Sequence, residues 1–106
     1  MSRIKQINNG VSEIDKVLHS PLRLNIVLIL DELEYCDAVF LVNQLNISWG
    51  NLSTHLNVLV NEKYVSSEKK FIEKKPKTIL SITQLGIERL QSYKQNMTNL
   101  IGDKNE

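Results

Sequence analysis

The segment 48–83 constrains the fold most, because its apolar residues change from helical spacing to strand spacing within a few positions. Its first part, 48–62, predicts an amphipathic helix that buries one stripe, made of Leu52, Leu56, Leu59 and Val60. Its second part, 65–82, alternates with a period of two and predicts a β-hairpin with its tip at 73–77. A helix followed directly by a hairpin indicates an α+β fold.

Helix-start signals divide the rest of the chain. Ser20 before Pro21 predicts a helix to about Leu33, and Asp37 predicts a cap for a short helix 38–45. The turn 46–48 then joins this short helix to the next, which makes a helix-turn-helix. Thr83 predicts the cap of a last helix, which we place at 84–101, and the run Asn8-Asn9-Gly10 restricts the first helix to 11–18. We therefore expect one domain over 1–106, with its core at 20–83.

Composition limits the class of protein. The chain has 106 residues, 42% of them hydrophobic, and a formal net charge of +1, as expected of one folded domain. The most apolar segment, Leu22 to Leu33, contains charged residues and is well short of the roughly 20 residues that a membrane helix needs. One cysteine, Cys36, gives no disulfide framework, and we expect a small buried thiol rather than a redox sensor. Without a recognisable secretory signal, we expect a cytoplasmic protein.

Four short motifs in order resemble the winged-helix regulators of the MarR and ArsR type, and most closely the small winged-helix DNA-binding domain proteins of archaea and bacteria. These are Ser20-Pro21-Leu22-Arg23 with Ile26, Gly50-Asn51-Leu52-Ser53-Thr54-His55-Leu56, the pair Tyr64-Val65, and Thr83-Gln84-Leu85-Gly86. The resemblance covers about His19 to Tyr93 and implies a homodimeric transcriptional regulator. One departure is Lys63, which stands where a glycine commonly ends the recognition helix.

The helix 48–62 is predicted to expose small polar groups on the side away from its apolar stripe. Such groups suit base edges in a major groove, because Asn pairs with adenine and Thr bonds a base or contacts a thymine methyl. The candidate contact residues are Ser48, Trp49, Gly50, Asn51, Ser53, Thr54, His55 and Asn57. Asn51 and Thr54 are the strongest candidates. Because no Arg or Lys lies between Trp49 and Glu62, we expect readout that favours A·T pairs.

Two of these residues have a second interpretation. Trp49 either packs against the preceding helix or leans on the sugar-phosphate backbone, and His55 either touches a phosphate or packs at the flank. The exposed polar face itself could be an ordinary solvated helix surface, although Glu, Lys, Gln and Arg are the usual residues there.

Positive charge is concentrated in the predicted hairpin. The segment 66–78 has a local excess of three positive charges, and its lysines are Lys69, Lys70, Lys74, Lys75 and Lys77. Beside a recognition helix they are candidates for phosphate or minor-groove contact, although lysines also serve as solubilising edges of hairpins. Arg23, at a helix start, is a candidate for the DNA backbone or for a structural salt bridge.

The terminal helices carry apolar residues beyond what one small domain needs, and we expect them to form a homodimer rather than only to pack within one chain. The predicted interface residues are Ile14, Leu18, Leu90, Tyr93, Met97, Leu100 and Ile101. A two-fold dimer predicts a pseudo-palindromic binding site on double-stranded DNA.

Enzymatic functions find little support in the sequence. The two histidines have no paired nucleophile, and neither a phosphate-binding glycine loop nor a metal-spaced cluster is present, so we expect no catalysis, metal or cofactor. The alternative to a DNA-binding regulator is a winged helix that serves as a protein-interaction module. The sequence does not indicate a small-molecule effector.

Overall fold

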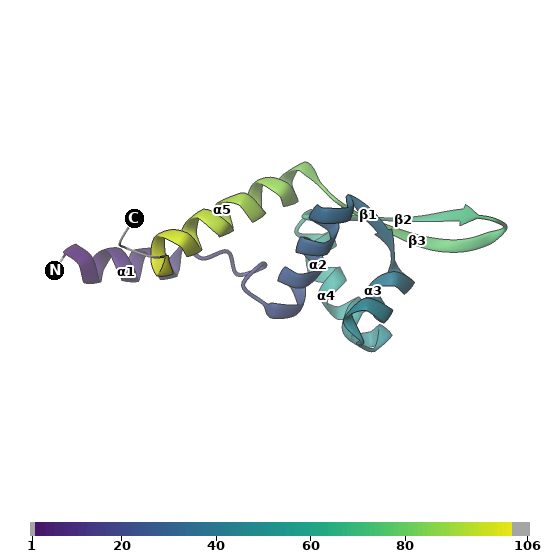
Figure 1. The fold of residues 1–106 in the computed structure, drawn as a ribbon, viewed down its shortest axis with the longest axis horizontal. Coiled ribbons are helices and arrows are strands. Elements are labelled where there is room, and N and C mark those ends of the chain that lie inside the picture. The colour runs from purple at the N-terminus through teal and green to yellow at the C-terminus, as the bar shows by residue number, and fades with distance from the viewer. Residues whose placement is uncertain (1, 103–106) are drawn as a thin grey trace.

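The computed structural model describes residues 2–102, and its elements follow the order of a winged helix with an additional helix at each end. The elements are α1 Ser2–Ser12, α2 Pro21–Leu33, β1 Tyr35–Asp37, α3 Ala38–Leu45, α4 Trp49–Asn61, β2 Val65–Ile72, β3 Lys75–Ile82 and α5 Gln84–Ile101. Helices α2, α3 and α4 lie together, the β2–β3 hairpin projects at one end, and α5 with α1 extends at the other (Figure 1). The molecule is accordingly elongated, at 62 × 24 × 23 Å. The α+β winged-helix prediction is confirmed.

The four predicted helix caps all form. Backbone N–H groups donate to Ser20 Oγ at 3.5 Å, to Asp37 Oδ1 at 2.8 Å, to Ser48 Oγ at 3.0 Å and to Thr83 Oγ1 at 2.9 Å. Each cap satisfies one N–H that the first helical turn leaves without a partner. The starts of α2, α3, α4 and α5 are therefore encoded locally.

The position of the first helix was predicted wrongly. We expected 11–18, but α1 runs through Asn8-Asn9-Gly10 and ends at Ser12. Gly10 is tolerated because α5 crosses it closely: a Cβ at this position would lie 2.6 Å from Leu100 Cδ2. Packing against α5 therefore outweighs the poor helix propensity of the run.

The segment after α1 is held in a turn by Asp15. Its Oδ1 accepts from the N–H groups of Val17 at 2.8 Å and Leu18 at 3.0 Å. A carboxylate that bonds the backbone in this way competes with helical hydrogen bonds, so the helix does not continue to Leu18.

The sheet has three antiparallel strands in the order β1-β3-β2, whereas two were predicted. Strand β1 pairs Tyr35 with Ser81 and Asp37 with Ile79, which covers the outer edge of β3 near the core. A strand of three residues is too short to show a period of two, so it could not be predicted from the pattern of apolar residues.

The hairpin turn is also shorter than predicted. Only Glu73 and Lys74 form it, at φ 53° and 66°, whereas Lys75, Pro76 and Lys77 belong to β3. Two left-handed residues make the tight turn that matches the twist of two antiparallel strands. The wing therefore reaches further as ordered sheet than the sequence suggested.

Helix α4 ends in a left-handed residue, as the resemblance implies, but this residue is Lys63 and not the usual glycine. Lys63 has φ 68°, its N–H donates to Val60 O, and the N–H of Tyr64 donates to Leu59 O. These two bonds close the helix in the pattern usually made by glycine. Leu52 and Leu59 on the inner face of α4 are fully buried in the core.

Replacing Gly86 with alanine should lower the free energy of unfolding by about 1–3 kcal/mol, because the site is overpacked by any side chain. A Cβ there would lie 2.2 Å from the backbone oxygen of Tyr64. Gly50→Ala is the matched control, since the nearest atom is 4.0 Å away and alanine favours a helix. Urea unfolding of both variants measures the difference, and equal stability of the two would contradict this packing.

Candidate nucleic-acid interface

Helix α4 presents its predicted polar face to solvent. Asn46 at φ 53° ends α3, and the cap at Ser48 then directs α4 across it. The exposed residues include every predicted contact of α4 except His55: Trp49, Gly50, Asn51, Ser53, Thr54 and Asn57. Thr54 Oγ1 donates to Gly50 O at 2.9 Å, so its methyl group and its remaining lone pairs are what it offers outward. The exposed face carries no charge between Trp49 and Asn61.

Trp49 lies between α4 and the wing. Its side chain is half exposed, at 53%, and it lines a cavity of about 350 Å³ together with the start of α3 and residues 75–78 of β3. The indole therefore neither packs fully against α3 nor stands free. It forms part of the surface that joins the recognition helix to the wing.

The wing lysines fall on two faces of the hairpin. The register pairs Lys69 with Thr78 on the face that meets α4, and Lys70 with Lys77 on the opposite face. Lys77 Nζ lies 3.7 Å from Asp37 Oδ2, an ion pair that ties the wing to the start of α3. Lys74 in the turn and Lys75 beside it are exposed. Lys70 Nζ lies 4.0 Å from Glu68 Oε2, so Lys69, Lys74 and Lys75 offer positive charge outward more fully than Lys70 and Lys77 do.

Arg23 makes hydrogen bonds inside the chain. Its Nε donates to Val17 O at 2.7 Å, its Nη2 to Lys16 O at 3.3 Å, and its Nη1 lies 3.1 Å from His55 Nδ1. Since the guanidinium only donates, the neutral His55 ring accepts at Nδ1. Neither of the alternatives for Arg23 anticipated this arrangement. It connects the segment before α2 to the middle of the recognition helix.

Comparison with known proteins agrees with this geometry. A family model described as a winged helix DNA-binding domain matches residues 22–101. The chain belongs to this winged-helix family. It is 36% identical over 78 residues to an uncharacterized protein of Methanocaldococcus jannaschii, covering 74% of this chain and 85% of the relative.

Two solved structures are similar to it. A transcriptional regulator homologue from Pyrococcus horikoshii superposes with a TM-score of 0.78 at 25% identity and covers 94% of both chains. A cysteine-to-serine mutant of MarR from Escherichia coli, solved in complex with operator DNA, has a TM-score of 0.64 at 17% identity, covering 91% of this chain and 74% of that one. The family and the first structure together support a DNA-binding regulator.

The terminal helices of this winged-helix protein bury part of the predicted dimer interface within the chain. Leu18, Leu90 and Tyr93 belong to the core, Ile14 and Met97 pack against it, and Leu100 lies over Gly10. Ile101 is 75% exposed. The predicted interface did not include Ile4, Ile7 and Val11, which are all exposed on α1. Ile4 and Ile7 were left out because the helix was expected to begin at residue 11, whereas α1 begins at Ser2.

The segment between α1 and α2 is bonded both to Tyr64, which follows α4, and to Tyr93 of α5. Tyr64 Oη donates to Asp15 Oδ2 at 2.6 Å, and His19 Nδ1 and Tyr93 Oη form a hydrogen bond at 2.9 Å. Burial, and then the bond to Asp15, raise the pKa of the Tyr64 hydroxyl to about 12. The hydroxyl therefore stays a donor to Asp15 throughout the neutral range.

Cys36 is expected to react slowly with iodoacetamide at neutral pH. Burial, followed by the charge of Asp37, raises the pKa of its thiol to about 11, so almost none is thiolate near pH 7. Because the folded pKa exceeds the unfolded one, this group should also lose its stabilising contribution as pH rises above about 9. Alkylation followed by mass spectrometry, with the unfolded chain as control, measures the difference. Equal rates in both states would contradict the burial.

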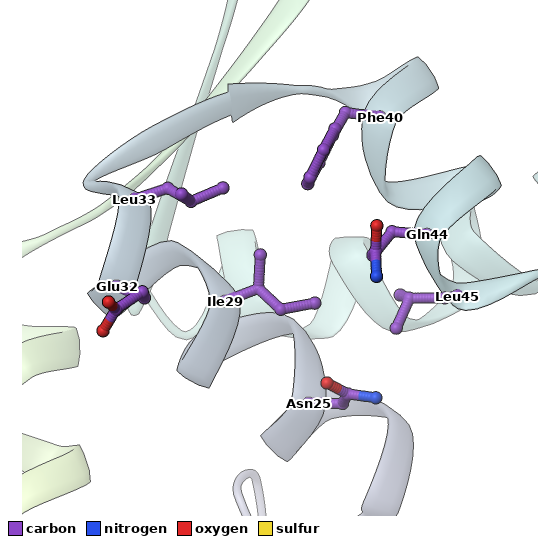
Figure 2. Close-up of a pocket in the computed structure, with 7 residues that line it drawn as sticks. All are labelled: Asn25, Ile29, Glu32, Leu33, Phe40, Gln44 and Leu45. Carbon is purple, nitrogen blue, oxygen red and sulfur yellow. The ribbon is translucent and has the colours of Figure 1, made fainter.

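A separate groove lies between α2 and α3. It measures about 370 Å³, and Ile29, Leu33 and Phe40 extend into it from the two helices (Figure 2). Its lining includes Glu32 but no lysine or arginine, so it does not suit a phosphate. We therefore leave it out of the nucleic-acid interface.

Within residues 2–102, no helix is both long and apolar enough to cross a membrane, and no group of His, Cys, Asp and Glu could hold a metal ion.

Proposed function

We propose that this protein is a sequence-specific regulator of transcription that binds double-stranded DNA as a homodimer, each chain acting as one winged-helix domain. The observation that carries the proposal is the exposed uncharged face of α4 next to a lysine-rich hairpin, with both packed on one core. Phosphate contacts position a protein on DNA and base contacts specify the sequence. Asn51 and Thr54 would supply base contacts, while Lys69, Lys74 and Lys75 would supply phosphate contacts. A regulator of this kind would act in the cytoplasm.

Arg23 and His55 have a different role in this proposal. The hydrogen bond between Arg23 and His55 holds α4 against the start of α2. The other hydrogen bonds of the guanidinium hold the segment before α2 in place. We infer that they orient the recognition helix and do not contact a phosphate themselves.

The homodimer would use α1 and the end of α5. The exposed stripe of Ile4, Ile7 and Val11, with Ile101, supports this assignment, because such apolar surface is costly in water. A two-fold axis through these helices would present two recognition helices to one face of the duplex.

An electrophoretic shift on the DNA upstream of the protein's own gene, across a salt series, tests the proposal. We expect retardation that survives an excess of unrelated duplex. Absence of binding even at low salt would favour the alternative, a winged helix that binds other proteins.

Neutralising Lys69, Lys74 and Lys75 with glutamine should flatten the dependence of log affinity on log salt by about 2–3, because each lost phosphate contact removes about 0.9 from the slope. Lys77→Gln is the control and should change the slope least, since Lys77 already pairs with Asp37. Fluorescence anisotropy at several salt concentrations gives the slopes. Unchanged slopes for the triple variant would remove the wing from the interface.

A further inference from the structure

Phe71 stands out on the wing because its aromatic ring is 79% exposed. Its strand position pairs it with Pro76, next to the hairpin turn. An aromatic ring and a proline ring side by side on an exposed strand pair form an apolar patch that nothing in the described chain covers. A hairpin that only kept the protein soluble would not need this patch.

The patch lies on the face of the sheet that meets the recognition helix. Residues 65, 67, 69 and 71 share one face of β2, and pairing places Thr78 and Pro76 on the same face of β3. Nearer the core, Ser67 and Thr78 of this face line a cavity of about 320 Å³ with Ser53 and Asn57 of α4. Phe71 therefore continues the surface of α4 outward along the wing.

The charges around the patch identify its partner as a polyanion. Lys69 lies two residues before Phe71 on the same face, and Lys74 and Lys75 follow it at the turn. Lys69 therefore shares the face of Phe71, Lys74 lies in the turn beside it, and Lys75 pairs with Ile72 on the opposite face. A surface of this kind fits a nucleic-acid groove, where phosphates line the edges and sugars and base edges form an apolar interior.

The length of the wing indicates which groove the patch reaches when α4 lies in the major groove. A strand rises about 3.3 Å per residue, so Phe71 lies about 13 Å beyond Ser67. In B-DNA the centre of a minor groove lies about 17 Å from that of the adjacent major groove, half of a helical turn. A wing that leaves α4 in the major groove therefore reaches the neighbouring minor groove with its last residues, Phe71 and the turn at Glu73 and Lys74.

We propose that Phe71 enters the minor groove beside the half-site read by α4, backed by Pro76, with Lys69 and Lys74 on the flanking phosphates. The inference rests on the proposed DNA-binding function and adds a second specificity element to it. The amino group at N2 of guanine fills the floor of a minor groove, whereas A·T pairs leave it open. Phe71 should therefore favour A·T pairs at the position that the wing reaches.

The experiment measures binding of the full chain to a duplex that wild type retains, together with Phe71→Ala and Ile72→Ala. Ile72 is the matched control, because it is the adjacent residue on the opposite face of β2. Phe71→Ala should weaken binding about tenfold, equivalent to about 1.4 kcal/mol, without changing the salt slope, since no charge is lost. Ile72→Ala should stay within about twofold of wild type. Circular dichroism should show both variants folded, because neither side chain is part of the core.

Base analogues locate the contact. G·C pairs placed where the wing reaches should weaken DNA binding by the wild-type protein. Inosine·C pairs lack the N2 amino group and keep the major-groove pattern, so they should restore the binding. Phe71→Ala should be insensitive to both changes.

Equal affinity of Phe71→Ala and wild type, or an equal response to inosine, would overturn the inference while leaving the proposed function intact. Failure of wild type to bind any duplex would instead overturn the proposed function. Binding of wild type to vesicles of anionic lipid, lost in Phe71→Ala while DNA binding is retained, would also overturn the inference, by showing that the patch contacts a membrane.

Discussion

Placing glutamate at both Ile7 and Val11 should produce a folded monomer whose affinity for a two-half-site duplex is about 100- to 10,000-fold lower than that of wild type. Both side chains are exposed in the single chain, so the change leaves the core intact. In a dimer, once one recognition helix has bound its half-site, the second is held close to the other half-site at a high effective concentration. A monomer loses this gain in affinity. Analytical ultracentrifugation gives the oligomeric state, and anisotropy titration gives the affinity.

Lys5→Glu on the same helix is the control for this variant. Lys5 lies away from the stripe formed by Ile4, Ile7 and Val11, so the added charge should leave the dimer unchanged. The proposed dimer would be wrong if the double variant stayed dimeric. It would also be wrong if wild type were a monomer at the concentrations at which it binds DNA.

Replacing Asn51 and Thr54 with alanine should remove most of the preference for the selected sequence. A good base contact is worth about 1–3 kcal/mol of discrimination, so two such losses should cost about 2–6 kcal/mol of specificity. Binding to unrelated duplex should change little, because the wing lysines remain. Competition titrations with specific and unrelated duplexes measure the ratio.

Asn61→Ala provides the comparison on the same helix. Asn61 is also exposed, but it lies at the end of α4, whereas the first turns of a recognition helix contact the bases. We expect it to keep nearly all of the specificity. An equal loss from Asn61→Ala would show that α4 lies differently in the groove.

Features encoded by neighbouring residues could be predicted from the sequence. The helix starts at Ser20, Asp37, Ser48 and Thr83 follow from side chains that bond the next turn, and each forms. The stripe on α4 follows in the same way, because periodicity alone determines which face is buried. The exposed polar face of the candidate site could therefore be predicted with the helix itself.

Features that depend on residues far apart in the sequence could not be predicted. Strand β1 exists because β3 lies beside it, and α1 passes through Gly10 because Leu100 packs there. The bond between Arg23 and His55 joins residues 32 positions apart, with no signal in either local segment. Phe71 was part of a correctly predicted strand, but its importance depends on a register that the longer predicted turn obscured.

Selection of bound duplexes from a random pool tests the central claim most directly. The claim is that α4, without Arg or Lys, reads bases while the wing supplies the charge. We expect an inverted repeat that favours A·T pairs at the contacted positions, with half-site centres one or a small number of helical turns of about 10 base pairs apart. Recovery of no preferred sequence, or of G·C-rich half-sites, would contradict the claim.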